Sequence, residues 1–208
     1  MNLNAFFPHI LAEVPSCPDP TVRLALIQTA VEFCRDTLAW SELLPPVAVT
    51  PGVPLQTIPA PTDGRALTVL EVYINGREIA SKTLTEIAAF DRNWLAQAGD
   101  VLFYNALTVR GTISLYPIPV ACQMSVLATF IPTNTATTLP DFLGNYHMDV
   151  IASGVKSRLM LMPSVAWTNE KLGAYYKSEF AKAVSKTRLD EIHQRAQGNL
   201  QVPARPFR

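Results

Sequence analysis

The chain has 208 residues, which is enough to bury a core without disulfides or structural metals. Hydrophobic residues make up 49% and charged residues only 16%. This composition excludes a chain that is disordered throughout, because disordered chains are rich in charge and poor in apolar side chains. Lysine plus arginine number 17, as do aspartate plus glutamate, and the resulting net charge of zero argues against a free-standing nucleic-acid-binding protein.

The charges are unevenly spread along the chain. Residues 1–100 hold 6 basic and 11 acidic side chains, whereas residues 101–208 hold 11 basic and 6 acidic ones. Such polarity suits head-to-tail or ring assembly of identical copies. A chance distribution with a basic helical end gives the same counts, and it is an interpretation of equal weight to assembly.

Three scattered cysteines, Cys17, Cys34 and Cys122, do not form a disulfide framework, and they predict a reduced, intracellular protein. The start of the chain lacks the basic and apolar regions of a signal peptide. No apolar run is long enough to predict a membrane span.

The N-terminal part predicts helix and then an irregular segment. Asp19-Pro20 is typical of a helix start, and apolar residues at helical spacing predict a helix over about 19–42. The apolar residues 3–14 are expected to pack on it. Six prolines within 45–61 exclude a helix there and favour a connector or a stiff sheet edge.

The middle of the chain predicts β-structure. Residues 67–74 and 77–84 flank Asn75-Gly76, a strong hairpin signal because both positions need positive φ. A short helix is expected at 85–96. Further strands are expected at 101–109, 112–117 and 122–130, which gives a β-sandwich or small barrel of about six strands over roughly 47–132.

Two helices are predicted after this module. The first runs over 141–162 and stops at Pro163. Gly154 lies in its middle, where glycine costs about 1 kcal/mol relative to alanine, so we expect another helix to approach closely there. The four residues 159–162 are apolar on every side of their turn, which indicates more than one neighbour.

Thr168 is expected to cap the second helix, with Trp167 and Leu172 at the two positions of a hydrophobic staple. This helix should reach about residue 197 and end at Gly198. The remaining residues form a proline-containing tail. Its candidate docking residues are Pro203, Arg205, Pro206, Phe207 and Arg208.

These elements predict an α+β fold. Residues 1–46 and 133–197 should join in one helical bundle, the β module 47–132 is inserted between them, and residues 198–208 form an extended C-terminal arm.

Catalytic signatures are missing from the sequence, which contains neither the glycine-rich phosphate-binding loops nor the nucleophile elbow of hydrolases. The three histidines, His9, His147 and His193, are far apart, so we expect no metal site. Cys34 lies on an apolar helix face and is expected to be an inert buried thiol.

Carboxylates do not change this expectation. The pairs Asp63 with Glu71 and Asp91 with Asp100 are weak candidates for acid–base chemistry, since carboxylates on turns and caps are common. The sequence therefore predicts no enzyme, no cofactor and no catalytic residue. The basic residues over 171–195 fit either a solvated helix face or contact with DNA phosphates.

Other features favour interaction with partners. Residues 101–140 contain a single charged side chain, Arg110, and neither aspartate, glutamate nor histidine. That stretch exceeds what one small β module needs to bury. Phe207 stands between prolines and arginines, as an anchor for a partner's groove would, although a tail of this kind is equally often disordered.

Two segments carry a resemblance to a known family. One is Glu13-Val14-Pro15-x-Cys17-Pro18-x-Pro20 with Ala30-x-Glu32-Phe33-Cys34-x-x-Thr37-Leu38-x-Trp40, and the other is Ile151-Ala152-Ser153-Gly154-x-x-x-Arg158-Leu159-x-x-Met162-Pro163-x-x-x-Trp167 with Tyr175-Tyr176-x-x-Glu179-Phe180. Together they resemble bacteriophage head-to-tail adaptor proteins of the tail tubular protein A type. These are packing patterns, and they cover both ends of the chain but not the β module.

The resemblance implies a structural virion protein. It implies a ring, commonly of twelve copies, beneath the portal protein at a capsid vertex, which joins the head to a tail nozzle or tail tube and contacts genomic DNA without sequence preference in its channel. Residues 198–208 would be the portal-docking arm, no membrane would be involved, and assembly would take place in the host cytoplasm. Two alternatives remain: another head-completion or tail component, such as a stopper or terminator ring, and a ligand-binding β-sandwich domain.

Overall fold

The structure is a computed structural model that describes residues 1–94, 96–107 and 111–195. The chain is a mixed α+β protein and divides into two compact units. One unit comprises Met1–Asn2 and Trp40–Pro140 and holds the strands; the other comprises Leu3–Ala39 and Asp141–Arg208 and holds the long helices. The β unit is therefore wider than the expected module 47–132 on both sides, because strands and loops on either side of that range pair with it.

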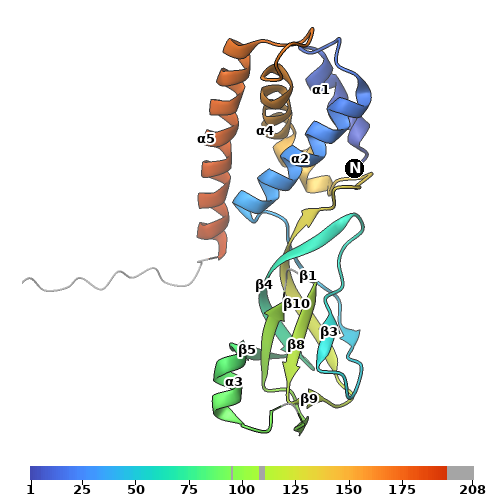
Figure 1. Cartoon of the computed structure of the whole chain (residues 1–208), viewed down its shortest axis with the longest axis vertical. Helices are drawn as coiled ribbons and strands as arrows, with labels where there is room; N and C mark the ends of the chain where they lie inside the picture. The colour runs from blue at the N-terminus through green and yellow to red at the C-terminus, as the bar shows by residue number, and fades with distance from the viewer. Residues whose placement is uncertain (95, 108–110, 196–208) are drawn as a thin grey trace, which may run out of the picture. The chain divides into compact units, whose positions relative to one another are not determined.

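The helical unit is built from both ends of the chain (Figure 1). Its described elements are a 3-10 helix η1 (Leu3–Phe6) and the α-helices α1 (Phe7–Leu11), α2 (Asp19–Thr37), α4 (Asp141–Met160) and α5 (Glu170–Arg195). Helix α4 contacts α1, α2 and α5. Its core-facing side chains are fully or almost fully buried, among them Leu143, Ile151, Val155 and Leu159.

Helix α2 starts as expected and ends five residues early. Asp19 and Pro20 open it, with Pro18 in extended conformation as the N-cap. It was expected to reach residue 42 but ends at Thr37. Leu38 adopts the left-handed conformation with φ of 58° and donates its N–H to the Cys34 carbonyl, which closes the helix without a glycine.

The β unit contains one curled, open sheet of eight strands among the described residues. The main path runs β1 (Ser41–Leu43), β10 (Gln123–Pro132), β4 (Gly64–Ile74), β5 (Arg77–Ser81), β7 (Phe103–Leu107), β8 (Thr112–Tyr116) and β3 (Leu55–Thr57); β2 (Val47–Ala48) pairs with β10 beside β1. Its buried face is apolar and includes Val72, Val126 and Phe130. A separate ribbon joins β6 (Ala98–Gly99) and β9 (Ile118–Pro119).

The β4–β5 hairpin is the strongest local prediction and is confirmed. Asn75 and Gly76 have φ of 50° and 80°, as a two-residue type I′ turn requires. Its register pairs Ile74 with Arg77, Tyr73 with Glu78 and Val72 with Ile79.

The expectation of about six strands was wrong, because five strands of only two or three residues lie outside the predicted ones or between them. Two of these, β2 and β3, lie in the proline-rich segment 45–61, and β3 ends the sheet path. The short helix expected at 85–96 is α3 (Leu84–Phe90). It ends earlier because Asp91 is extended and its carboxylate accepts from the Asn93 N–H, which makes a turn.

No helix within the described part of the chain is both long and apolar enough to cross a membrane.

Candidate functional site

Gly154 lies in α4 where α2 and α5 come closest to it. A Cβ atom at this position would stand 2.5 Å from Thr29 Cγ2 on α2, and 2.8 and 2.9 Å from two ring carbons of Phe180 on α5. Ordinary contacts of a Cβ atom lie between 3.4 and 4 Å, so only glycine fits without movement. The three helices therefore pack closely around this residue.

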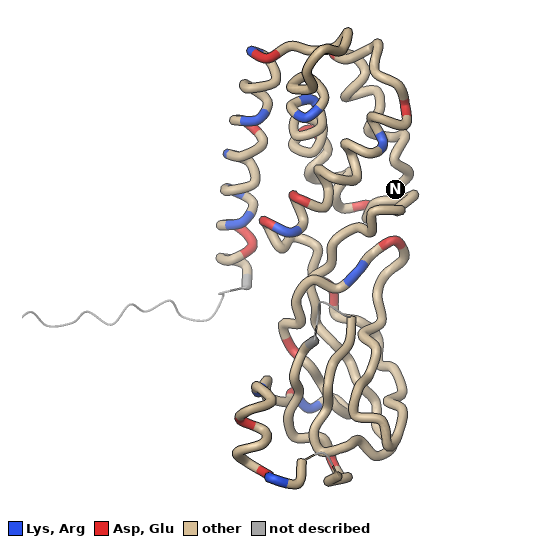
Figure 2. Tube along the Cα trace, in the orientation of Figure 1, with Lys and Arg blue, Asp and Glu red and all other residues tan. Residues whose placement is uncertain are grey.

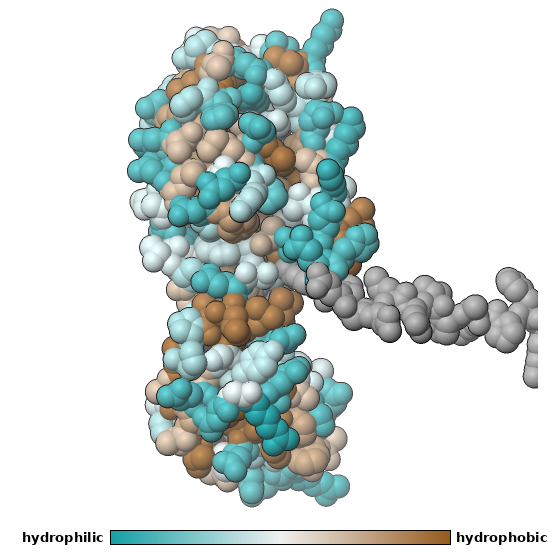
Figure 3. All heavy atoms as spheres, turned by 180° about the vertical axis from the view of Figure 1, so that it is seen from behind, coloured by the Kyte–Doolittle hydropathy of each residue, from teal (hydrophilic) through white to brown (hydrophobic). Residues whose placement is uncertain are grey.

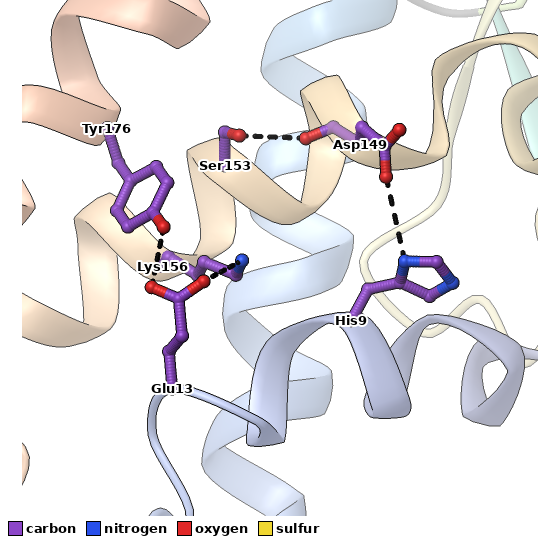
Figure 4. Close-up of polar contacts among 6 residues, drawn as sticks. All are labelled: His9, Glu13, Asp149, Ser153, Lys156 and Tyr176. Atoms are coloured by element: carbon purple, nitrogen blue, oxygen red, sulfur yellow. Dashed lines mark hydrogen bonds and ion pairs between the residues drawn. The ribbon is translucent and has the colours of Figure 1, made fainter.

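A polar cluster joins the N-terminal segment to α4 and α5 (Figure 4). One oxygen of Glu13 accepts a hydrogen bond from Lys156 Nζ at 2.6 Å, and the other accepts from the Tyr176 hydroxyl at 2.5 Å. The ammonium group of Lys156 also lies 4.9 Å from the centre of the Tyr176 ring, which is cation–π geometry. Three segments distant in sequence are thus tied through one carboxylate.

The pKa values in this cluster follow from its geometry. Burial by itself would raise the pKa of Glu13, but the hydrogen bonds from Lys156 and Tyr176 and the Lys156 charge outweigh it, so the pKa is lowered. The hydrogen bond to Glu13 raises the pKa of Tyr176 to about 12, with burial adding to the shift. The charged carboxylate and the neutral phenol are therefore the forms that the fold favours.

Two further contacts connect the same parts of the chain. Arg158 on α4 makes an ion pair with Glu32 on α2, and both side chains are partly exposed. His9 Nδ1 lies 3.6 Å from an Asp149 oxygen, but Asp149 is 95% exposed. Exposed pairs of this kind contribute little to stability, so Gly154 and the Glu13 cluster carry more of the packing specificity.

The candidate catalytic groups are engaged in structural contacts. Asp63 accepts hydrogen bonds from the backbone and side chains of residues 137 and 138, Glu71 accepts from Tyr73, and Asp91 accepts from Tyr116. The structure therefore gives each of these three carboxylates a structural role.

Cys34 and His147 also pack against other residues of the helical unit. Cys34 is fully buried, and burial raises its pKa to about 12, so the neutral thiol is the form that the fold favours. The His147 ring lies tilted against the Phe33 ring, with the ring centres 4.8 Å apart, and burial lowers the pKa of His147. Across residues 1–94, 96–107 and 111–195, no three His, Cys, Asp or Glu side chains lie close enough together to hold a metal ion.

The start of α5 differs from the sequence expectation. Asn169, not Thr168, caps the helix, because its Oδ1 accepts the Leu172 N–H at 3.2 Å. The Thr168 hydroxyl instead donates to the Met162 carbonyl at 2.6 Å. With Asn169 as the cap, the two positions of a hydrophobic staple are Thr168 and Gly173. Trp167 and Leu172, which were expected to form the staple, each lie one residue before these positions, and both side chains are half-buried.

The basic residues of α5 lie along an exposed helix (Figure 2). Lys171, Lys177 and Lys186 are exposed, and Lys182 pairs with Glu179 at 2.8 Å. The proposed arm residues Pro203, Arg205, Pro206, Phe207 and Arg208 lie outside the described residues.

Sequence reasoning missed an opening in the sheet. Strands β5 and β7 pair in parallel only at Ala80–Phe103 and Ser81–Tyr104. Beyond this, hollows of about 240 and 360 Å³ open between β5 and residues 100–102, and both are walled by Arg77, Ile79 and Val101. Within the described residues, no strand pairs with Arg77–Ile79 on the side away from β4.

Apolar side chains near this opening reach the surface. Phe90 on α3 is 60% exposed and packs edge-on against Phe103, with ring centres 5.4 Å apart. Leu102 and Val120 are also exposed. Apolar atoms appear at the surface of both units in the space-filling view (Figure 3). No local sequence pattern indicated the opening, because it arises where two strands far apart in sequence diverge.

Comparison with known proteins returned no matching family model and no matching curated protein.

Proposed function

We propose that the chain is a non-enzymatic structural virion protein, a head-to-tail adaptor that forms a ring beneath a portal protein. The family resemblance implies that this ring has twelve copies. The ring would join the capsid to the tail nozzle or tail tube and line the channel through which the genome leaves. In this proposal both ends of the chain make one helical bundle, and the β unit meets neighbouring copies or the tail.

One observation carries this proposal: the two segments that resemble adaptor proteins hold each other in the helical unit. Glu13 accepts from Tyr176, and Glu32 pairs with Arg158. In each pair one residue comes from the N-terminal segment and the other from the C-terminal one. A resemblance limited to packing patterns has more weight when the resembling residues are those that pack together.

The β unit supports a role in assembly. Its strands carry few charges, and apolar side chains such as Leu43, Leu55 and Phe90 are 45–60% exposed. In the proposal, a neighbouring copy or the tail covers these side chains. A ring needs two different complementary faces on each copy, and the opposite charge balances of the two halves of the sequence suit that need.

The last six residues test the portal contact. In the proposal, Pro203 to Arg208 dock on the portal, with Phe207 as the apolar anchor and Arg205 and Arg208 beside it. A chain lacking residues 203–208 should fold with unchanged helix content yet be absent from purified particles. The variant Arg205→Lys, which keeps the charge and the anchor, is the matched control and should be incorporated.

The measurement is the amount of the chain in purified particles, determined by mass spectrometry. Normal incorporation of the shortened chain would refute the portal-docking role of these residues.

A further inference from the structure

We propose that the opening between β5 and residues 100–102 is a strand-insertion site, and that its occupant is the segment Asn199–Val202 of a second copy of the chain. The proposal goes beyond the adaptor function. It requires two copies to associate, but it requires neither a portal protein nor a virus particle.

The hairpin register decides which backbone groups face the opening. In a two-residue hairpin the pair next to the turn, Ile74 with Arg77, is hydrogen-bonded, so the next pair, Tyr73 with Glu78, is not. The N–H and C=O groups of Glu78 therefore point away from β4 and into the opening. A strand laid beside β5 would find both a donor and an acceptor there.

The walls of the opening suit apolar side chains of an extended segment. Ile74, Ile79, Val101 and Val120 line it, and the two adjoining hollows of about 240 and 360 Å³ exceed the roughly 30 Å³ that a water molecule occupies. Strands β5 and β7 pair only from Ala80 and Phe103 onward, so among the described residues the outer edge of Arg77–Ile79 has no neighbouring strand.

A second copy of β5 is a poor occupant. Antiparallel pairing of two β5 edges about Glu78 would place two glutamates directly opposite each other, and like charges in that position destabilise a strand pair. The occupant must therefore be a different segment.

The C-terminal segment has the required pattern. Leu200 and Val202 alternate with Asn199 and Gln201, and Pro203 ends the alternation, as expected for a four-residue strand. Thirteen residues follow Arg195 in the sequence, and at about 3.3 Å per residue an extended chain of that length spans up to roughly 40 Å.

The charges at the opening also complement the C-terminal segment. Arg205 and Arg208 follow the proposed strand, and the rim of the opening carries Glu78 and Asp100 beside Arg77.

The test uses the full chain carrying Gln201→p-benzoylphenylalanine, a photo-activated cross-linking residue. Equal amounts of copies with natural and heavy nitrogen isotopes are mixed, irradiated and analysed by mass spectrometry. The proposal predicts cross-links between light and heavy copies that join position 201 to residues 77–80 or 100–102.

Variants at Glu78 distinguish backbone pairing from side-chain effects. Glu78→Pro removes the outward N–H but not a β4–β5 hydrogen bond, and it should lower the cross-link yield about tenfold. Glu78→Ala keeps the N–H and should retain the yield. Circular dichroism checks that both variants are folded. The double variant Leu200→Asp with Val202→Asp should also abolish the cross-links. Because neither residue belongs to β4 or β5, this second test does not rely on a substitution within the hairpin.

Three results would overturn the proposal: cross-links only within one copy, cross-links to other residues or none at all, and an unchanged yield in Glu78→Pro or in the double aspartate variant. Copies that cross-link as predicted but never form a ring on particles would refute the adaptor function and leave this inference standing.

Discussion

Replacing Gly154 by alanine should destabilise the helical unit, although the same change stabilises most helices. In an open helix, Gly→Ala gains about 1 kcal/mol. Here the new methyl group would lie 2.5 Å from Thr29 Cγ2, about 1 Å short of ordinary contact. Thr29 is fully buried and its hydroxyl donates to the Ala25 carbonyl at 2.8 Å, which fixes its rotamer.

The helices must therefore move apart. Overpacking costs about 1–3 kcal/mol in packed cores, and because three atoms would lie within 2.9 Å of the new methyl group we expect about 2–3 kcal/mol here. We expect a net loss of about 1–2 kcal/mol for Gly154→Ala after the gain in helix propensity, and more for Gly154→Leu. In urea unfolding followed by circular dichroism at 222 nm, the alanine variant should show a midpoint about 0.5–1 M lower.

Two further variants test the cause. Asn145→Leu adds a larger side chain at an exposed position of α4 and should leave the free energy of unfolding within about 0.5 kcal/mol of that of the original chain. Thr29→Ser removes the obstructing methyl group while keeping the hydroxyl, so it should recover part of the loss when combined with Gly154→Ala. An alanine variant as stable as the original chain, or more stable, would show that the helices do not meet closely at Gly154.

The remaining predictions concern the Glu13 cluster and the cap of α3. Folding lowers the pKa of Glu13 from its ordinary value of 4.5, so its stabilising contribution is complete above that pH and is lost as the pH falls through the lowered value. Thermal unfolding at pH 3 and 6 should show this acid loss, and Glu13→Gln should reduce it. Tyr176 has its pKa raised from 10.0 to about 12, so its contribution is complete below pH 10 and is lost as the pH rises through about 12; Tyr176→Phe should remove that alkaline loss. Thr83→Ala removes the side-chain cap of α3 and should cost about 1 kcal/mol, seen as faster hydrogen exchange in α3 with α5 unchanged. Equal exchange in α3 would contradict the role of the cap.

The parts of the fold that depend on local signals could be predicted from the sequence. Asn75-Gly76 specifies a turn that few other residues adopt, and Asp19-Pro20 specifies a helix start. The long helices also follow, because their apolar residues recur at helical spacing. Gly154 could be singled out because a glycine in mid-helix has a cost that close packing would explain.

Features that depend on distant residues could not be predicted. The strand β1 exists because Ser41–Leu43 meet β10, some 85 residues later, and nothing in its own three residues indicates a strand. Helix α2 ends at Thr37 because the next residue, Leu38, adopts a left-handed conformation that a leucine seldom adopts. The choice of Asn169 over Thr168 as the cap depends on where the Thr168 hydroxyl finds the Met162 carbonyl.

The same reasoning explains why the candidate surfaces were only partly predicted. The sequence indicated apolar strands without partners, but not the opening beside Glu78, which results from the divergence of β5 and β7. The packing contacts of Glu13 with Lys156 and Tyr176 join residues more than 140 positions apart. Periodicity within one element holds no information on such pairs.

Electron microscopy of particles recovered through a tag on this chain tests the central claim most directly. The adaptor function predicts that the tag recovers virus particles, with ring density of about twelve-fold order, as the resemblance implies, beneath the portal at a single capsid vertex. A 22.8 kDa species recovered without any particle would contradict it.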